Sequence, residues 1–160
     1  MKKLVLAAIV GITAFLSSSA QAQSSASANF NVTITLTSSC TFGAITPVDF
    51  AYTSFQATPQ NATGGGFTVT CTSGRPFTFG LQAGNGAAVP PGAATIPVTD
   101  NALNLAYNLA LSAAGGTGTG AAQAFNVTGT MANGQGGTCA GATCTNAAST
   151  NAVQTLIVNF

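Results

Sequence analysis

Residues 25–36 read Ser-Ala-Ser-Ala-Asn-Phe-Asn-Val-Thr-Ile-Thr-Leu, and this stretch alternates between polar and apolar side chains without a break. Every even position is apolar and every odd position is polar. Successive side chains of a β-strand point to opposite faces, so a period of two predicts a strand with one apolar face. The side chains that we expect this strand to bury are Ala28, Phe30, Val32, Ile34 and Leu36.

The same period continues through the chain, and no stretch has the caps and spacing of an amphipathic helix. Further strands are predicted at residues 48–52, 66–72, 77–83, 103–111, 124–131 and 153–160. Clusters of Gly, Pro, Asn and Ser predict loops at residues 61–66, 73–76, 84–97, 115–120 and 133–151. About seven short strands at this spacing predict an all-β fold, an immunoglobulin-like sandwich with phenylalanines in its core.

Charge is nearly absent, because only 3% of the 160 residues are charged. The charged residues are Lys2, Lys3, Asp49, Arg75 and Asp100, and the chain has no histidine. A nucleic-acid surface needs several Lys or Arg, and general acid–base catalysis needs a His or a tuned carboxylate. We therefore expect no enzyme, no nucleic-acid partner and no cofactor. Arg75 lies in a turn sequence, Ser-Gly-Arg-Pro, where a solvated side chain is expected.

The N-terminal segment has the parts of a secretory signal peptide. A basic start and an apolar run over residues 4–16, too short to span a bilayer, precede the cleavage sequence Ala20-Gln21-Ala22. Residues 1–22 are therefore predicted to be removed by cleavage between Ala22 and Gln23. No later stretch is apolar enough to cross a membrane, so we expect an exported protein of a bacterial envelope.

Export places the four cysteines in an oxidising compartment, where two disulfides are the simplest expectation. Zinc is the rival interpretation, but zinc sites use paired Cys-x2-Cys or Cys/His spacings that are absent here. Three pairings are possible. We favour Cys40 with Cys71 and Cys139 with Cys144, because the second pair can close a tight local loop.

The last predicted strand, residues 153–160, runs to the end of the chain, so the sandwich is expected to leave an edge open. In one interpretation, residues 25–36 of one molecule fill the open edge of another molecule, as a donor strand does. In the other, residues 25–36 form the first strand of their own domain. The alternating pattern alone leaves both open.

Six short segments, taken in order, resemble the spore coat protein U domain family, which includes Csu-type major fimbrial subunits. The segments are Ser39-Cys40-Thr41-Phe42, Phe67-Thr68-Val69-Thr70-Cys71-Thr72, Leu105-Ala106-Tyr107-Asn108-Leu109, Gly116-Thr117-Gly118-Thr119-Gly120, Phe125-Asn126-Val127-Thr128-Gly129 and Val158-Asn159-Phe160. The resemblance covers the chain after the signal peptide, although the pair Cys139 and Cys144 and the dipeptide Val153-Gln154 depart from the family pattern.

The resemblance implies an incomplete immunoglobulin-like pilin of the archaic chaperone–usher pathway, in which each subunit lacks its last strand. The N-terminal extension of the next subunit supplies that strand, so residues 23–37 are expected to be the donor-strand extension and residues 38–160 the pilin domain. It also implies that Cys40 pairs with Cys71. The implied partners are other copies of the subunit, a periplasmic chaperone and an outer-membrane usher.

The expected product is a cell-surface fimbrium for adhesion and biofilm formation. The alternative is a secreted coat-like or adhesive sandwich that closes on its own first strand.

Overall fold

The computed structural model describes residues 24–84 and 95–160. The chain divides into an N-terminal unit, of which residues 24–35 are described, and a domain formed by residues 36–160. Every element in the described residues is a β-strand, and all of the strands belong to the domain. The predicted all-β fold is confirmed. The predicted signal peptide, residues 1–22, and its cleavage site lie outside the described residues.

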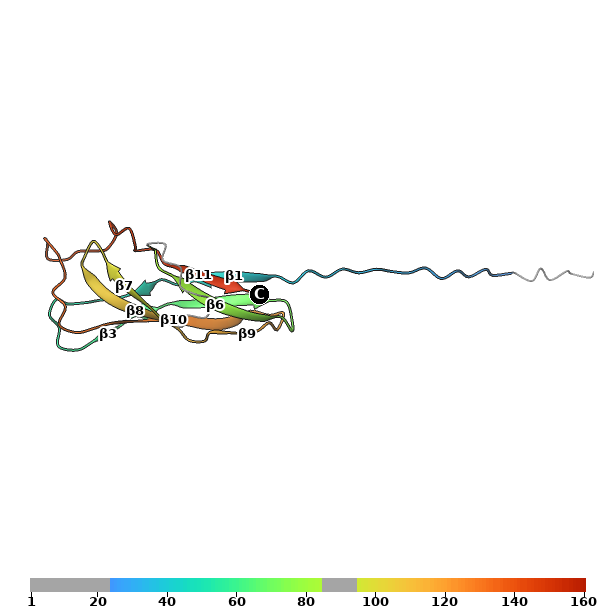
Figure 1. Cartoon of the computed structure of the whole chain (residues 1–160), viewed down its shortest axis with the longest axis horizontal. Helices are drawn as coiled ribbons and strands as arrows, with labels where there is room; N and C mark the ends of the chain where they lie inside the picture. The colour runs from blue at the N-terminus through green and yellow to red at the C-terminus, as the bar shows by residue number, and fades with distance from the viewer. Residues whose placement is uncertain (1–23, 85–94) are drawn as a thin grey trace, which may run out of the picture. The chain divides into compact units, whose positions relative to one another are not determined.

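Two antiparallel sheets make up most of the domain (Figure 1). The first sheet has the order β1 (Cys40–Ile45), β5 (Gly66–Cys71), β10 (Gln123–Met131), β8 (Leu105–Leu111) and β7 (Thr95–Asp100), and β3 (Gln60–Asn61) pairs with the end of β10. The second sheet has the order β11 (Thr155–Asn159), β6 (Pro76–Gln82) and β9 (Gly115–Thr117). Strands β2 (Val48–Asp49) and β4 (Thr63–Gly64) form a separate pair.

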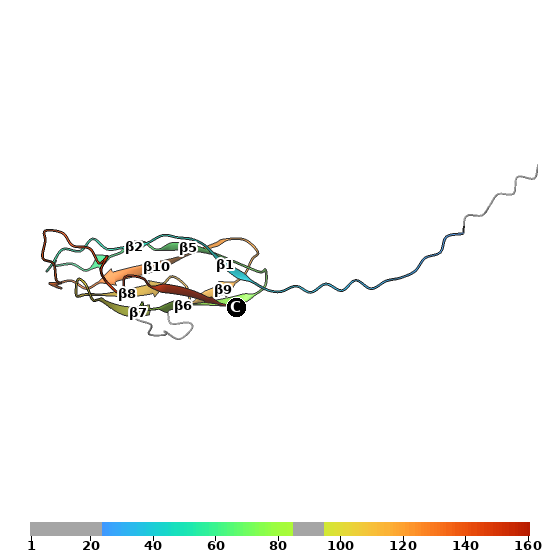
Figure 2. The ribbon, with the colours of Figure 1, turned by 90° about the horizontal axis from the view of Figure 1, so that it is seen from above.

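Side chains from both sheets meet in one core. Phe67 and Val69 of β5 and Phe79 and Leu81 of β6 expose at most 3% of their surface. The rings of Phe67 and Phe79 meet edge to face across the two sheets, with centroids 5.2 Å apart. Figure 2 shows β5 and β10 on one side of the domain and β6 on the other. The arrangement is that of the predicted immunoglobulin-like sandwich.

The six strands predicted after residue 40 are present, with ends shifted by at most three residues. Strand β7 corrects the prediction of a loop over residues 84–97, because it begins at Thr95 and includes Pro97. Proline has no backbone N–H to donate, and it is tolerated here because β7 is the outer strand of the first sheet. Residues 85–94 of that predicted loop lie outside the described residues.

The prediction that the phenylalanines fill the core is wrong for three of them. Phe30, Phe55 and Phe160 expose 85%, 75% and 47% of their surface. Phe55 lies in a turn with a φ of 61°, and its backbone N–H donates to the Gln135 carbonyl at 2.8 Å. This turn holds the backbone and leaves the ring outside. Phe30 belongs to the alternating N-terminal stretch, which forms no strand in the structure.

Candidate functional site

The inward-facing side chains of two outer strands are only half-buried. They are Cys40 and Phe42 of β1, and Leu156 and Val158 of β11, and all four pack against the buried core. Strand β1 is one of the two outer strands of the first sheet, and β11 is one of the two outer strands of the second. We call these two strands, with their half-buried side chains, the open edge.

The open edge also leaves backbone groups without a strand partner. Within the described residues β1 pairs only with β5, and β11 pairs only with β6. Figure 1 shows β1 and β11 on the same side of the domain. A strand edge with free N–H and C=O groups is a template for pairing with another strand. The open edge therefore offers both hydrogen bonds and apolar contacts to an added strand.

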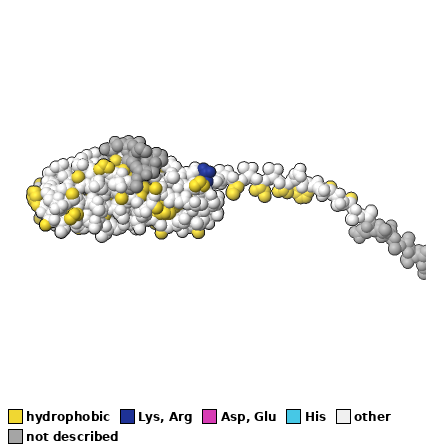
Figure 3. Space-filling model, turned by 60° about the horizontal axis from the view of Figure 1, so that its bottom comes forward, with side chains coloured by type: hydrophobic (Ala, Val, Ile, Leu, Met, Phe, Trp, Pro, Cys, Tyr) yellow, Lys and Arg dark blue, Asp and Glu magenta, His cyan; other side chains and the backbone are white. Residues whose placement is uncertain are grey.

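The five side chains predicted to line a donor strand are all exposed. Phe30, Val32, Ile34 and Leu36 expose 71% to 85% of their surface, and Ala28 is exposed as well. Figure 3 shows the apolar side chains along one side of the described N-terminal segment. Four large exposed apolar side chains in one row are typical of an interaction surface.

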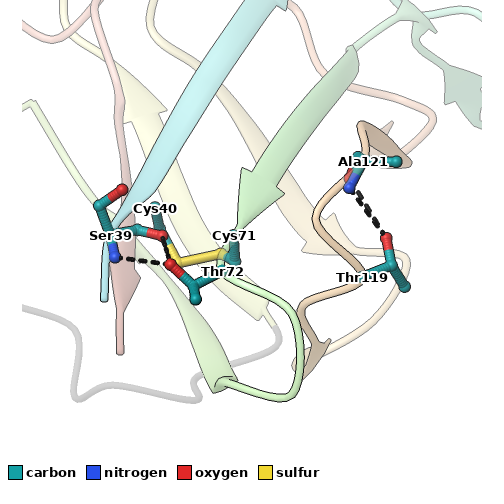
Figure 4. Close-up of a disulfide and its surroundings, with 6 residues drawn as sticks. All are labelled: Ser39, Cys40, Cys71, Thr72, Thr119 and Ala121. Atoms are coloured by element: carbon teal, nitrogen blue, oxygen red, sulfur yellow. Dashed lines mark hydrogen bonds between the residues drawn. A yellow bond between two sulfur atoms is a disulfide. The ribbon is translucent and has the colours of Figure 1, made fainter. Parts of the chain in front are cut away.

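The first disulfide joins Cys40 of β1 to Cys71 of β5, as predicted. The two residues are opposite each other in the strand register. In the chain-entropy model, closing a loop of this length stabilises the fold by about 4 kcal/mol. Next to it, the Ser39 N–H donates to the Thr72 hydroxyl at 3.0 Å, as Figure 4 shows. Ser39, the residue before β1, is thus attached to the start of the β5–β6 turn.

Glycine-rich residues 118–120 pack against this turn. The Gly118 N–H donates to the Arg75 carbonyl, and the Gly74 N–H donates to the Gly118 carbonyl, both at 2.8 Å. A Cβ atom on Gly118 would lie 2.3 Å from the Thr72 carbonyl oxygen, so only glycine allows this approach. The stretch predicted as a loop over residues 115–120 therefore contributes β9 and a support for the turn. We call the first disulfide, this turn and the glycine loop the hairpin pole.

The opposite end of the domain contains a cavity of about 520 Å³. Three aromatic rings line it, from Phe50, Tyr52 and Tyr107, together with the carboxylates of Asp49 and Asp100. The second disulfide, Cys139–Cys144, is present as predicted and contributes Cys144 to the same wall. We call this end the cavity pole.

The two carboxylates have different surroundings. Asp49 is exposed, whereas Asp100 exposes only 3% of its surface. The Asp100 Oδ1 accepts hydrogen bonds from the N–H groups of Ala102 and Leu103, at 3.0 and 2.7 Å. Its Oδ2 is buried and has no hydrogen-bond partner within the described residues. Asp49 therefore faces solvent, whereas the carboxylate of Asp100 is enclosed and held by backbone donors.

Burial alone raises the pKa of Asp100, but the hydrogen bonds that its carboxylate accepts, led by the Leu103 N–H, hold the pKa below its usual range. The pKa of Tyr107 is raised, first by burial and then by the negative charge of Asp100, which outweigh a hydrogen bond from Gln154. The lowered pKa favours the charged form of Asp100, which lies beside the cavity.

Polar contacts tie the segment before β11 to the cavity pole. The Asn151 side chain is almost fully buried, and its Nδ2 donates to the Thr99 carbonyl at 2.5 Å. Its Oδ1 accepts from the backbone N–H of Asn101, which follows Asp100 in the chain. These contacts place Asn151 beside the end of β7.

The family model of the spore coat protein U domain matches residues 26–156. This chain belongs to the spore coat protein U domain family. The match includes all four cysteines and residues 26–36 of the alternating stretch, and it confirms the resemblance to this family. The family consists of structural coat and fimbrial proteins. Neither the curated proteins nor the solved structures contain a significant match to the chain.

In this spore coat U domain, the sequence did not predict that Asp49 and Asp100 line the same cavity. The two residues are about fifty positions apart, and no motif links them. None of the described residues forms a cluster of three or more potential metal-ligating side chains. The described residues also contain no helix of the length and hydrophobicity needed to span a membrane.

Proposed function

We propose that this chain is a fimbrial subunit that polymerises by donor-strand complementation. Residues 1–22 are removed on export, residues 23–37 form the donor extension, and residues 38–160 form the pilin domain. The extension of one copy adds a strand to the open edge of the next, and the product is a surface fibre for adhesion and biofilm formation. The observation that carries this proposal is the open edge, with half-buried apolar side chains beside free strand edges.

Burial of the donor side chains supplies the driving force. Covering Phe30, Val32, Ile34 and Leu36 contributes about 1.5–3 kcal/mol for each side chain, or roughly 6–12 kcal/mol before the cost of ordering the segment. Backbone hydrogen bonds to β11 and β1 add to this. The contact joins unlike surfaces of two copies, so it does not close on itself and continues into a filament.

The direction of the added strand follows from the antiparallel order of the second sheet. A strand that runs antiparallel to β11 continues the pattern of β6, β9 and β11. It extends along the sandwich from the hairpin pole to the cavity pole, because β11 runs the other way. The donor subunit then lies beyond the cavity pole of the acceptor, in a head-to-tail order.

The same open edge explains the expected assembly partners. A subunit whose apolar edge is uncovered is prone to aggregation in the periplasm. A periplasmic chaperone that covers the edge, and an outer-membrane usher that exchanges it for a donor strand, are the partners that we propose. The chaperone and the usher go beyond the family assignment, because coat proteins and fimbrial proteins share this domain.

The alternative is a secreted coat-like or adhesive sandwich in which residues 25–36 complete their own domain. In the structure, residues 24–39 form no strand, and their apolar side chains are exposed. These observations favour exchange between copies over self-closure.

Deletion of residues 23–37 tests the proposal. The intact protein is expected to form a ladder of SDS-resistant oligomers, and the truncated protein is expected to form none, because it has no strand to donate. The double substitution Phe30→Ser with Ile34→Ser should also abolish the ladder, since it removes half of the large apolar contacts. The matched control is Asn31→Ser with Thr35→Ser, which changes only the polar face and should leave the ladder intact. If the truncated and intact proteins are equally stable monomers with no ladder, the proposal is wrong.

A further inference from the structure

The only basic side chain in the described residues lies at the pole opposite to both carboxylates. Arg75 is exposed at the tip of the β5–β6 turn, at the hairpin pole. Along β10, Gln123 is opposite Val69 and Met131 is opposite Tyr107, and eight steps of about 3.3 Å separate these two ends of the strand by roughly 26 Å. Arg75 therefore cannot reach the Asp49 and Asp100 cavity of its own copy.

Hydrogen bonds on both sides hold the backbone of Arg75 in place. Its N–H donates to the Thr72 carbonyl at 3.1 Å, and its carbonyl accepts from the Gly118 N–H at 2.8 Å. Gly74, the residue before it, has a φ of 78°, which the tight turn requires. The turn is thus held from both sides, while the guanidinium remains in solvent.

The cavity at the other pole has the chemistry that binds a guanidinium. Asp49 offers an exposed carboxylate at its wall, and the buried carboxylate of Asp100 adds negative charge behind that wall. Phe50, Tyr52 and Tyr107 add aromatic rings to the same wall. Carboxylates pair with arginine through its planar fork of donors, and aromatic faces attract its positive charge.

Donor-strand exchange brings the two poles of neighbouring copies together. If Ala28 is laid opposite Asn159, Val32 of the antiparallel donor strand lies opposite Thr155 at the start of β11, and Leu36 extends roughly 13 Å further toward the cavity pole. Asn151 is hydrogen bonded to Asn101, next to Asp100. Ser39 follows three residues after Leu36, about 10 Å of chain at most, and Ser39 is hydrogen bonded to Thr72 of the turn that presents Arg75.

We propose that, in the fibre, Arg75 of each subunit docks at the cavity lined by Asp49 and Asp100 of the subunit that accepts its donor strand. This contact joins a second copy of the chain to the cavity and restricts the angle between successive subunits. The inference rests on the proposed strand exchange, because only that exchange sets the hairpin pole of one copy beside the cavity pole of the next. It assigns a role to the three charged side chains of the exported chain.

The test uses two charge-reversal variants, Arg75→Asp and Asp49→Arg, separately and mixed. Chains are diluted from guanidinium chloride into low-salt buffer, and the initial rate of SDS-resistant ladder formation is measured. Each variant alone places like charges at every contact, so we expect its ladder to form on the order of tenfold more slowly than that of the intact chain. An equimolar mixture restores opposite charges at every contact between unlike copies, and its rate should return to within about twofold of the intact rate.

A matched control separates the local contact from overall charge. The variant Asp49→Asn with Thr128→Arg has the net charge of Asp49→Arg, but its new arginine lies on an exposed position of β10 away from the cavity. Mixed with Arg75→Asp, it keeps the native pair only where its own Arg75 meets Asp49 of the other copy, and it puts no arginine at the cavity that meets the substituted turn. Its rate should therefore recover clearly less than the rate of the mixture with Asp49→Arg. At about 1 M NaCl all the variants should assemble at similar rates, because the Debye length falls to about 3 Å.

The outcomes distinguish the two proposals. Slow single variants with a restored mixture support the docking of Arg75, and a control mixture that is equally restored overturns it. Single variants that assemble as fast as the intact chain also overturn the docking, while the ladder itself leaves strand exchange standing. Absence of any ladder from the intact chain rejects the proposed function, and the docking with it.

Discussion

Strands β6 and β11 are neighbours in one sheet, and their inner side chains are direct partners in the register. Leu156 pairs with Leu81, and Val158 pairs with Phe79. Leu81 and Phe79 expose 2% and 0% of their surface, whereas Leu156 and Val158 are only half-buried. Strand β6 lies between two strands, and β11 lies at the edge. Alternation decides which side chains face the core, and the number of neighbouring strands decides how completely they are covered.

The partners Phe79 and Val158 give the largest expected contrast. Phe79→Ala should lower the free energy of unfolding by about 3–5 kcal/mol, because the ring fills a closed part of the core. Val158→Ala should lower it by only about 1 kcal/mol, because solvent already reaches that side chain. Urea denaturation of dilute monomer measures both. Equal losses would show that the edge of the second sheet is as closed as its centre.

The two strands of the open edge also differ in covalent support. A disulfide joins β1 to β5, whereas β11 contains no cysteine. Replacing Cys40 and Cys71 by serine should lower the free energy of unfolding by about 4 kcal/mol, and replacing Cys139 and Cys144 by about 2 kcal/mol, because the second loop is much shorter. Thermal or urea denaturation of the two double variants compares them. A larger loss from the Cys139–Cys144 pair would contradict the loop-length argument.

The smallest expected effect is a change in the pH dependence of stability, which Asp100 at the cavity pole should cause. The folded-state pKa of Asp100 is lowered, so its contribution to stability is present above the unfolded pKa and is lost as the pH falls through the folded pKa. The intact protein should therefore lose more stability than Asp100→Asn between pH 6 and pH 3. Melting temperatures across this range measure the difference. Parallel pH curves for the two proteins would remove Asp100 from this role.

Much of the fold follows from short-range pattern. A spacing of two puts Phe77 and Phe79 on the same face of the strand predicted at residues 77–83, and both are buried. The pairing of Cys139 with Cys144 was predicted from their closeness in the chain, and it is present. Strand β7 was missed because Pro97 usually ends a strand, and only the sheet order shows that β7 is an outer strand that tolerates proline.

The candidate site divides in the same way. The apolar row from Ala28 to Leu36 can be read from residues 25–36, because side-chain alternation is a local property of an extended backbone. The sequence by itself determined that row, the all-β fold and the near absence of charge. Only the tertiary structure decided that β1 and β11 lie at sheet edges, that Asp49 and Asp100 share a cavity, and that Arg75 lies at the opposite pole. Those positions depend on which distant strands pair, and pairing between distant strands leaves no periodic signal in the chain.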